Sequence, residues 1–234
     1  MSEQRDKNLW IFNAGNSFAG NPKWMFEYII RHHKEIKPVW MCYNADTMNY
    51  VHKLGYEAEL YHSSKGKSVM AKAGVYVVEM CKEVFQPELT GITVLNLWHG
   101  VGCKSIERKV TDGFLQERIA KKYIQNNDIL RNNQLFLVTS EIMEKHFKEQ
   151  CGIDDDKVIR AGYPRCVVND NIQSYDHDIR KKKGLSANTK LAIYCPTYRD
   201  NNGANFMKSA LPDMKRLAEV LHENNILLIL KMHP

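Results

Sequence analysis

The stretch LWIFNAGNSFAGNPKWMFEYII, residues 9–30, decides the fold class of this chain. Its first four residues form a short apolar run, which predicts a buried strand. A loop rich in Gly, Asn and Ser follows over 13–20. Asn21-Pro22 then predicts a helix start, with asparagine as the N-cap and proline at the first helical position. A strand joined to a helix by a short polar loop is the repeating unit of α/β domains.

The same alternation continues along the chain. Further strands are predicted over 39–43, 57–61, 75–78, 92–97, 135–138 and 158–160, and further helices over 45–54, 63–71, 114–132 and 140–150. Strands that alternate with helices predict a parallel sheet with helices on both faces. Because crossovers between parallel strands are right-handed, we expect this sheet to be doubly wound, as in Rossmann-type domains.

A change in composition marks a second domain. Residues 169–189 are rich in Asn, Asp and Ser and carry the basic run 180–184, which predicts a linker with a short helix. We therefore expect an N-terminal domain over 1–168 and the start of a second Rossmann-type domain over 190–234. The latter shows one βαβ unit, with strands over 191–194 and 226–230 and a helix over 207–223. One such unit has too little core to be stable alone.

Composition and charge limit the classes of protein to which the chain can belong. Charged residues make up 26% and hydrophobic residues 44% of the 234, as in soluble globular proteins. The net charge of +6 favours anionic partners: phosphates, an anionic lipid surface or nucleic acid. The six cysteines form no C-x-x-C pair, which indicates reduced thiols in a cytosolic protein. The polar N-terminus lacks a signal-peptide core, and no apolar stretch approaches the roughly 18–20 residues that span a bilayer.

Two histidines follow predicted strands. His99 comes after the strand over 92–97, and His233 comes after the strand over 226–230. Ligands of open α/β sheets bind beyond the carboxyl ends of the strands, so these imidazoles are candidates to face each other across a cleft. Gly100 would leave room for a substrate beside His99, and Lys104 could hold a phosphate. A purely structural role for His99 is an equally good interpretation.

Several polar residues are candidates for phosphate binding. Asn16 and Ser17 lie in a loop whose glycines would let backbone N–H groups approach an anion at a helix N-terminus, although an ordinary turn fits equally well. The loop lacks the spacing of a nucleotide-binding motif. Arg165 suits a phosphate or carboxylate, or a surface ion pair. Four more candidates follow the strands of the second domain: Thr197, Arg199, Asp200 and Lys231. No cluster has metal-site spacing, so any Mg²⁺ would be held by a diphosphate substrate.

Taken in order, six blocks of the chain resemble one family. They resemble the CDP-glycerol glycerophosphotransferases, the teichoic acid and capsule polymerases of bacteria. The blocks are Asn16-Ser17-Phe18, residues 21–28, Leu97-Trp98-His99-Gly100, Gly162-Tyr163-Pro164-Arg165, residues 196–200 and residues 230–234.

The resemblance implies a GT-B-like fold, which consists of two Rossmann-type domains with the active site between them. It implies transfer of glycerol phosphate, or a related polyol phosphate, from CDP-glycerol to a hydroxyl of a polyol-phosphate polymer or lipid-linked acceptor, with release of CMP. Members of the family are peripheral on the cytoplasmic face of the bacterial plasma membrane and need no nucleic acid partner or covalently bound cofactor. By the resemblance, His99 matches the proposed general base and His233 the histidine near the donor diphosphate. Arg165 and Arg199 match basic positions of the family.

The chain also departs from the family pattern. Val101-Gly102 stands where the family has Thr-Pro, and Cys166-Val167 stands where it has Asn-Asp. The chain stops before the family's later Asp-Tyr-Ser-Ser block, so we expect most of the donor domain to be missing. Two alternatives remain open: a nucleotide-sugar glycosyltransferase of GT-B fold, and a truncated, non-catalytic module that binds an anionic polymer.

An anionic membrane surface is a further candidate partner. The side chains that could contact it are cationic: Lys104, Arg108, Lys109, Arg118, Lys121 and Lys122. A solvated helix face is the competing interpretation, because these residues have no apolar stripe beside them.

Overall fold

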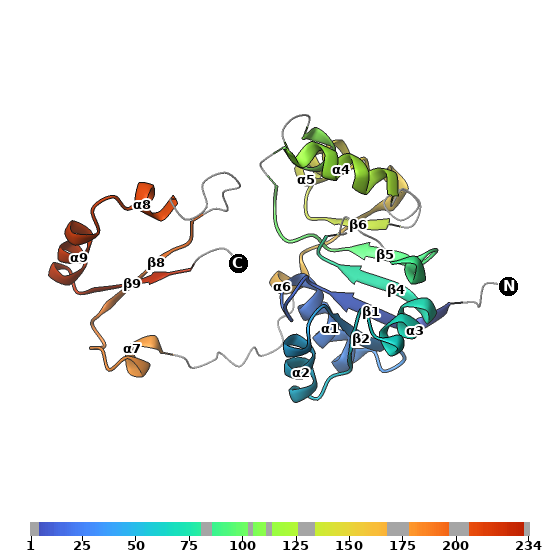
Figure 1. Cartoon of the computed structure of the whole chain (residues 1–234), viewed down its shortest axis with the longest axis horizontal. Helices are drawn as coiled ribbons and strands as arrows, with labels where there is room; N and C mark the ends of the chain where they lie inside the picture. The colour runs from blue at the N-terminus through green and yellow to red at the C-terminus, as the bar shows by residue number, and fades with distance from the viewer. Residues whose placement is uncertain are drawn as a thin grey trace. The chain divides into compact units, whose positions relative to one another are not determined.

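The computed structural model describes residues 5–80, 86–102, 105–110, 114–125, 134–167, 178–196 and 206–231. The chain divides into two compact units, Met1–Asn169 and Asp170–Pro234. Each unit has a sheet of its own (Figure 1). The linker predicted over 169–189 falls partly outside the described residues.

The first unit alternates strands and helices, as predicted from the sequence. Its strands are β1 (Asp6–Asn13), β2 (Lys37–Cys42), β3 (Ala58–Leu60), β4 (Ala73–Val78), β5 (Thr93–Asn96), β6 (Gln134–Val138) and β7 (Val158–Arg160). Its helices are α1 (Gly20–His32), α2 (Ala45–Lys53), α3 (Ser64–Lys72), α4 (Phe114–Gln125), α5 (Glu141–Cys151) and α6 (Pro164–Val167), with 3-10 turns η1 (Pro87–Leu89), η2 (Glu107–Lys109) and η4 (Asp155–Lys157). The helix predicted over 114–132 is described to Gln125.

The seven strands form one sheet in the order β3-β2-β1-β4-β5-β6-β7. Every neighbouring pair is parallel. The chain winds outward from β1 to β3, returns to the other side of β1 as β4, and continues outward to β7. This order confirms the predicted doubly wound α/β fold. It places the topological switch point, where such sheets bind ligands, between β1 and β4.

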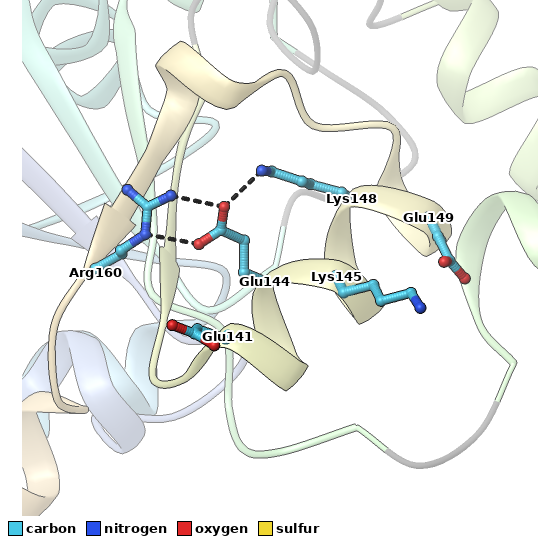
Figure 2. Close-up of a pocket in the computed structure, with 6 residues that line it drawn as sticks. All are labelled: Glu141, Glu144, Lys145, Lys148, Glu149 and Arg160. Atoms are coloured by element: carbon cyan, nitrogen blue, oxygen red, sulfur yellow. Dashed lines mark hydrogen bonds and ion pairs between the residues drawn. The ribbon is translucent and has the colours of Figure 1, made fainter.

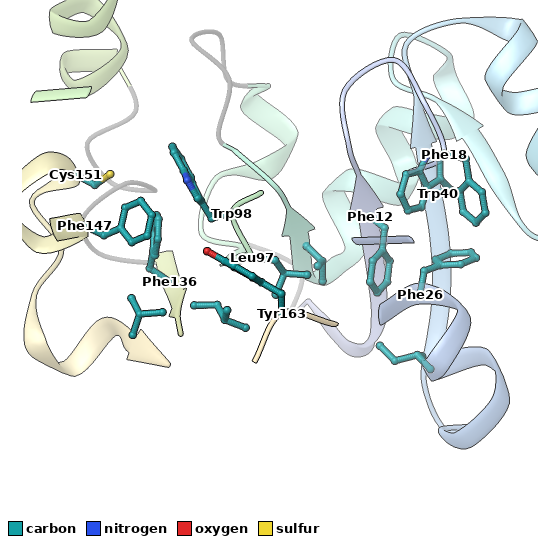
Figure 3. Packing of buried hydrophobic residues seen from close by; sticks show 14 of the residues in the cluster. Phe12, Phe18, Phe26, Trp40, Leu97, Trp98, Phe136, Phe147, Cys151 and Tyr163 are labelled. Atoms are coloured by element: carbon teal, nitrogen blue, oxygen red, sulfur yellow. The ribbon is translucent and has the colours of Figure 1, made fainter. Parts of the chain in front are cut away.

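Both faces of this sheet are buried, because successive residues of a strand point to opposite faces. In β1, Phe12 packs with Phe26 of α1 and Phe147 of α5 in one hydrophobic cluster. Its neighbour Ile11 packs with Met70 of α3 in the other cluster. Figure 3 shows the first cluster, in which the aromatic side chains extend from β1 and α1 to the segment that carries Leu97 and Trp98.

The first residues of α3 and α1 show how these two helices are capped. Ser63 precedes α3 and is its N-cap, because its Oγ accepts a hydrogen bond from the Gly66 N–H at 2.8 Å. The cap predicted at Asn21 is wrong. Helix α1 begins at Gly20, two residues before the predicted start at Pro22, and its N-cap residue Ala19 offers no side-chain cap. Asn21 is fully buried inside the first turn, and its side chain bonds to another part of the chain.

The second unit contains one parallel strand pair, β8 (Lys190–Tyr194) and β9 (Ile226–Leu230). The single helix predicted over 207–223 is wrong, because two helices, α8 (Phe206–Ala210) and α9 (Met214–Glu223), stand there. Pro212 cannot continue a helix, and Asp213 starts the second one by accepting from the Arg216 N–H at 2.8 Å. A short helix, α7 (Ile179–Lys182), precedes β8. Among the described residues of this unit no hydrophobic side chain is buried, in line with its small core.

Candidate functional site

Three neighbouring strands end at the same level, at the switch point of the sheet. Val78, the last residue of β4, pairs with Asn13 at the end of β1 and with Asn96 at the end of β5. The segments that leave these strands therefore start side by side. The segment after β5 carries His99, which is the candidate general base.

The turn between Asn96 and His99 has an unusual backbone. Trp98 has a φ of 51°, in the left-handed region that bulky residues rarely adopt. Its N–H donates to Oδ1 of Asn96 at 3.0 Å, and its carbonyl accepts from Nδ2 of Asn21 at 2.7 Å. Its indole is buried against Phe136 and Phe147, at ring-centre distances of 5.6 and 5.3 Å (Figure 3).

His99 lies at the surface, with one ring face covered. Its imidazole stacks on Trp98 at 4.5 Å with an interplanar angle of 24°. The backbone of Glu79, the residue after β4, lies near the ring and favours its protonated form. The pKa of His99 is lowered from its ordinary value of 6.5, because partial burial disfavours the charged ring more than Glu79 favours it. In the neutral ring one of the two nitrogens carries the lone pair that a general base needs.

Two residues of the segment around α6 hold the His99 turn from outside. Nη2 of Arg165 donates to the carbonyl of His99 at 2.7 Å, and the hydroxyl of Tyr163 donates to the carbonyl of Gly100 at 2.8 Å. The Arg165 guanidinium also lies 5.8 Å from the ring centre of Tyr163. The structure thus brings together three predicted site residues, His99, Gly100 and Arg165. The sequence analysis missed Tyr163 as a member of this cluster, although it stands in the same Gly-Tyr-Pro-Arg block.

A carboxylate lies at the N-terminus of α1, for which the sequence left open a bound anion or an ordinary turn. Oε1 of Glu79 accepts from the Asn21 N–H at 2.8 Å. Gly20, at a φ of 68°, makes this approach possible, because a Cβ there would lie 1.7 Å from that oxygen. Pro22 has no N–H, so the first turn of α1 has few donors left for a phosphate. Nothing in the local sequence points to Glu79, which the sheet order alone brings beside α1.

The remaining candidates are spread over the chain. Asn16 and Ser17 are exposed in the loop after β1, where the Asn16 carbonyl accepts from the Thr47 hydroxyl at 2.8 Å. Lys231 is exposed after β9, and its N–H donates to the Tyr194 carbonyl at 3.0 Å. The other candidates lie outside the described residues, and their roles stay predictions: Lys104, Thr197, Arg199, Asp200 and His233.

One of the six residues predicted to form a cationic surface does not contribute to it. Lys122 is buried, and its ammonium donates to both carboxylate oxygens of Glu107 at 3.0 and 2.9 Å. It is therefore not free to bind an anionic surface. Arg108, Lys109 and Lys121 are exposed, and Lys104 lies outside the described residues. None of the helices in the described part of the chain is long and apolar enough to cross a lipid bilayer.

A hollow lies between α5 and β7, with a volume of about 430 Å³ (Figure 2). Its central carboxylate is already paired. Glu144 accepts two hydrogen bonds from Arg160, both at 2.7 Å, and a third from Lys148 at 2.5 Å. Lys148 also pairs with Asp155 at 2.7 Å. These charges satisfy one another, so the hollow is a weaker candidate than the His99 cluster. Within the described residues no three His, Cys, Asp or Glu side chains converge as metal ligands.

The chain is similar in sequence to teichoic acid polymerases. The chain is 24% identical to a teichoic acid poly(glycerol phosphate) polymerase of Bacillus subtilis strain 168, over 94% of this chain and 30% of the relative. It is 22% identical to the protein of that name from Bacillus spizizenii strain W23, over 98% of this chain and 60% of the relative. The chain thus spans less than two thirds of the length of these relatives.

Solved structures support the fold. A structure of the wall teichoic acid polymerase TagF superposes with a TM-score of 0.76 at 20% identity, over all of this chain and 58% of that one. A UDP-N-acetylglucosamine 2-epimerase from Rickettsia bellii has a TM-score of 0.56 at 12% identity. The first match confirms the predicted GT-B-like fold. The family model of CDP-glycerol:poly(glycerophosphate) glycerophosphotransferases matches residues 1–234, so the chain belongs to this family.

Proposed function

We propose that the protein transfers glycerol phosphate, or a related polyol phosphate, from CDP-glycerol to a hydroxyl group at the end of a polyol-phosphate acceptor. The acceptor oxygen attacks the phosphorus that bears the glycerol. The bond from this phosphorus to the bridging oxygen of the diphosphate breaks, and CMP leaves. His99 takes the proton from the attacking hydroxyl.

The observation that carries this proposal is the state of the His99 ring. A polyol hydroxyl is a poor nucleophile at neutral pH, so a base with a pKa near or below the working pH accelerates its attack. The pKa of His99 is lowered by partial burial, which keeps the ring neutral. The neutral ring has one nitrogen with a lone pair that can accept the proton of the acceptor hydroxyl. Gly100 follows directly and adds no side chain beside the imidazole.

The substrates are tested by measuring CMP release. The protein, purified at the full length that its gene encodes, is incubated with CDP-glycerol and a glycerol phosphate oligomer. We expect CMP release and chain growth that both depend on the acceptor. UDP release from UDP-sugars in place of this activity would favour a glycosyltransferase. Polymer binding that weakens with salt, without turnover of either donor, would favour the non-catalytic module.

We propose further that the protein works at an anionic membrane surface. Arg108 and Lys109 of η2 and Lys121 of α4 are exposed cations, and α4 and η2 contact each other. Such cations attract anionic lipid headgroups in a salt-dependent way. Sedimentation with phosphatidylglycerol vesicles should weaken in Lys121→Glu and stay unchanged in Lys53→Glu, an equal charge reversal on α2. Equal binding by both variants would remove this surface from consideration.

A further inference from the structure

The segment that presents His99 depends on one residue in an unfavourable conformation. Trp98 adopts a left-handed backbone although it is neither glycine nor asparagine. Such conformations persist only where the surrounding structure holds them, and they concentrate at functional sites. A relaxed backbone at Trp98 would turn His99 in another direction. The contacts that hold Trp98 therefore also orient His99.

Two buried asparagine side chains bond both backbone polar groups of Trp98. Asn96 accepts from its N–H at 3.0 Å, and Asn21 donates to its carbonyl at 2.7 Å. Both asparagines are themselves fixed. Nδ2 of Asn96 donates to Gln134 at 3.0 Å, and the N–H of Asn21 donates to Glu79 at 2.8 Å.

Asn21 also connects this turn to Arg165. Its Oδ1 accepts a long hydrogen bond, 3.4 Å, from the Arg165 N–H, and the Arg165 side chain reaches back to the His99 carbonyl. Asn21 has no solvent exposure, and its side chain donates to Trp98 and accepts from Arg165. Its polar atoms thus join the segments that follow β4, β5 and β7.

We infer that Asn21 and Asn96 are positioning residues, which hold Trp98 in its left-handed conformation and thereby fix the orientation of the His99 ring that stacks on its indole. This inference deepens the proposed function. Only the expected effect of the asparagines on turnover rests on that proposed function. The direction of the ring and its tautomer can be measured without any substrate.

The first test is nitrogen NMR of the histidine rings, with His99→Gln to assign the signal of His99. In the wild-type protein we expect one dominant neutral tautomer, because the stacked ring keeps one orientation relative to the Glu79 backbone, which favours a proton on the nearer nitrogen. In Asn21→Ala we expect the two tautomers to mix. The pKa of His99 should rise toward 6.5 as the ring loses its cover, while Glu79 and Arg165, the charged groups that face it, remain in the chain.

The matched control is Asn13→Ala. Asn13 is also a buried asparagine at a strand end, and its Nδ2 donates to two backbone carbonyls, those of Gly15 and Met41, at 3.0 and 2.8 Å. Neither belongs to the His99 turn. We expect Asn13→Ala to leave the tautomer and the pKa of His99 unchanged.

A second variant keeps the test decisive if Asn21→Ala does not fold. Asn96→Ala should mix the tautomers in the same way, whereas Asn96→Ser, whose hydroxyl can still accept from the Trp98 N–H, should largely preserve the wild-type signal. A folded Asn21→Ala or Asn96→Ala protein with wild-type His99 signals would overturn the inference.

Turnover separates this inference from the proposed function. We expect Asn21→Ala to lower kcat about ten- to a hundredfold with little change in KM, since a misdirected base slows the chemical step more than it weakens binding. Full activity of His99→Gln would refute His99 as the base. In that case the NMR comparison would still decide whether the asparagines hold the turn.

Discussion

The Arg165 guanidinium donates a hydrogen bond to the backbone carbonyl of His99 at 2.7 Å, although the two residues are 66 positions apart in the chain. The sequence analysis proposed both as site residues on separate grounds. Their contact has an electrostatic consequence, because a positive charge beside an imidazole disfavours its protonation. The charge of Glu79 has the opposite effect on the pKa of His99.

The first prediction follows from these opposite effects. Arg165→Gln removes a charge that lowers the pKa of His99, so this pKa should rise. Glu79→Gln removes a charge that raises it, so the pKa should fall, while the amide oxygen can still accept from the Asn21 N–H. Histidine titration by NMR measures both. Shifts of the same sign in the two variants would show that these charges do not act on His99 as the structure indicates.

The second prediction concerns His99 itself. His99→Gln should lower kcat by about 10²–10⁴, the usual contribution of a general base. Activity needs the neutral ring, and its pKa is lowered from 6.5, so the acid limb of the wild-type pH profile should lie below pH 6.5. His62→Gln, which changes an exposed histidine, is the control and should keep both rate and profile. A wild-type acid limb above pH 6.5 would argue against His99 as the titrating base.

Local patterns in the sequence predicted the strands and most helices well. The run over 75–78 is apolar throughout and became β4, because a strand buried on both faces needs no alternation. Local patterns failed where a side chain has a distant partner. Asn21 shows the signal of an N-cap, but its amide bonds to the carbonyl of Trp98, 77 positions away.

Lys122 illustrates the same limit. Beside Lys121 on a polar helix, Lys122 is typical of a solvated face. Its partner Glu107 lies on another element, 15 positions back, and in no helical register with it.

The cluster around His99 was predictable in part. The strand ends placed His99 and Gly100 at the correct edge of the sheet, whereas Glu79 and Tyr163 join it only through the sheet order and the chain's return after β7.

The third prediction concerns the neighbouring lysines Lys121 and Lys122. The Lys122 and Glu107 side chains are 7% and 11% exposed, so removing the ammonium leaves a largely buried carboxylate without its partner. Lys122→Ala should lower the free energy of unfolding by about 3–5 kcal/mol. Lys121→Ala, one residue away and exposed, should change it by less than about 0.5 kcal/mol. Chemical denaturation measures both, and equal effects would contradict the burial of the pair.

The fourth prediction concerns Arg5, which holds the segment before β1. Its guanidinium donates to four backbone carbonyls, those of Met70, Ala73, Glu88 and Thr90, at 2.6–2.9 Å. Arg5→Ala should cost about 2–4 kcal/mol of stability, because hydrogen bonds from a charged donor are worth more than neutral ones.

Arg5→Lys should recover only part of this loss, since an ammonium cannot reproduce the planar set of donors of a guanidinium. Lys7→Ala, an exposed change on β1, serves as the control in the same denaturation experiment. Full recovery by lysine would show that charge alone, and not the four-way contact, stabilises the segment.

The fifth prediction is a pH dependence at the ion-pair cluster between α5 and β7. Hydrogen bonds from Lys148, and then from Arg160, lower the pKa of Glu144 below its ordinary value of 4.5. A carboxylate with a lowered pKa in the folded state stabilises the protein above its unfolded pKa and loses this effect as the pH falls through the folded value. Glu144→Gln should therefore lower Tm at pH 7, and the difference from wild type should shrink as the pH falls below 4.5.

Glu149→Gln changes another carboxylate of the same hollow and should leave Tm nearly unchanged at every pH. A Tm difference for Glu144→Gln that persists undiminished at pH 3 would mean that the residue stabilises the protein by packing and not by its charge.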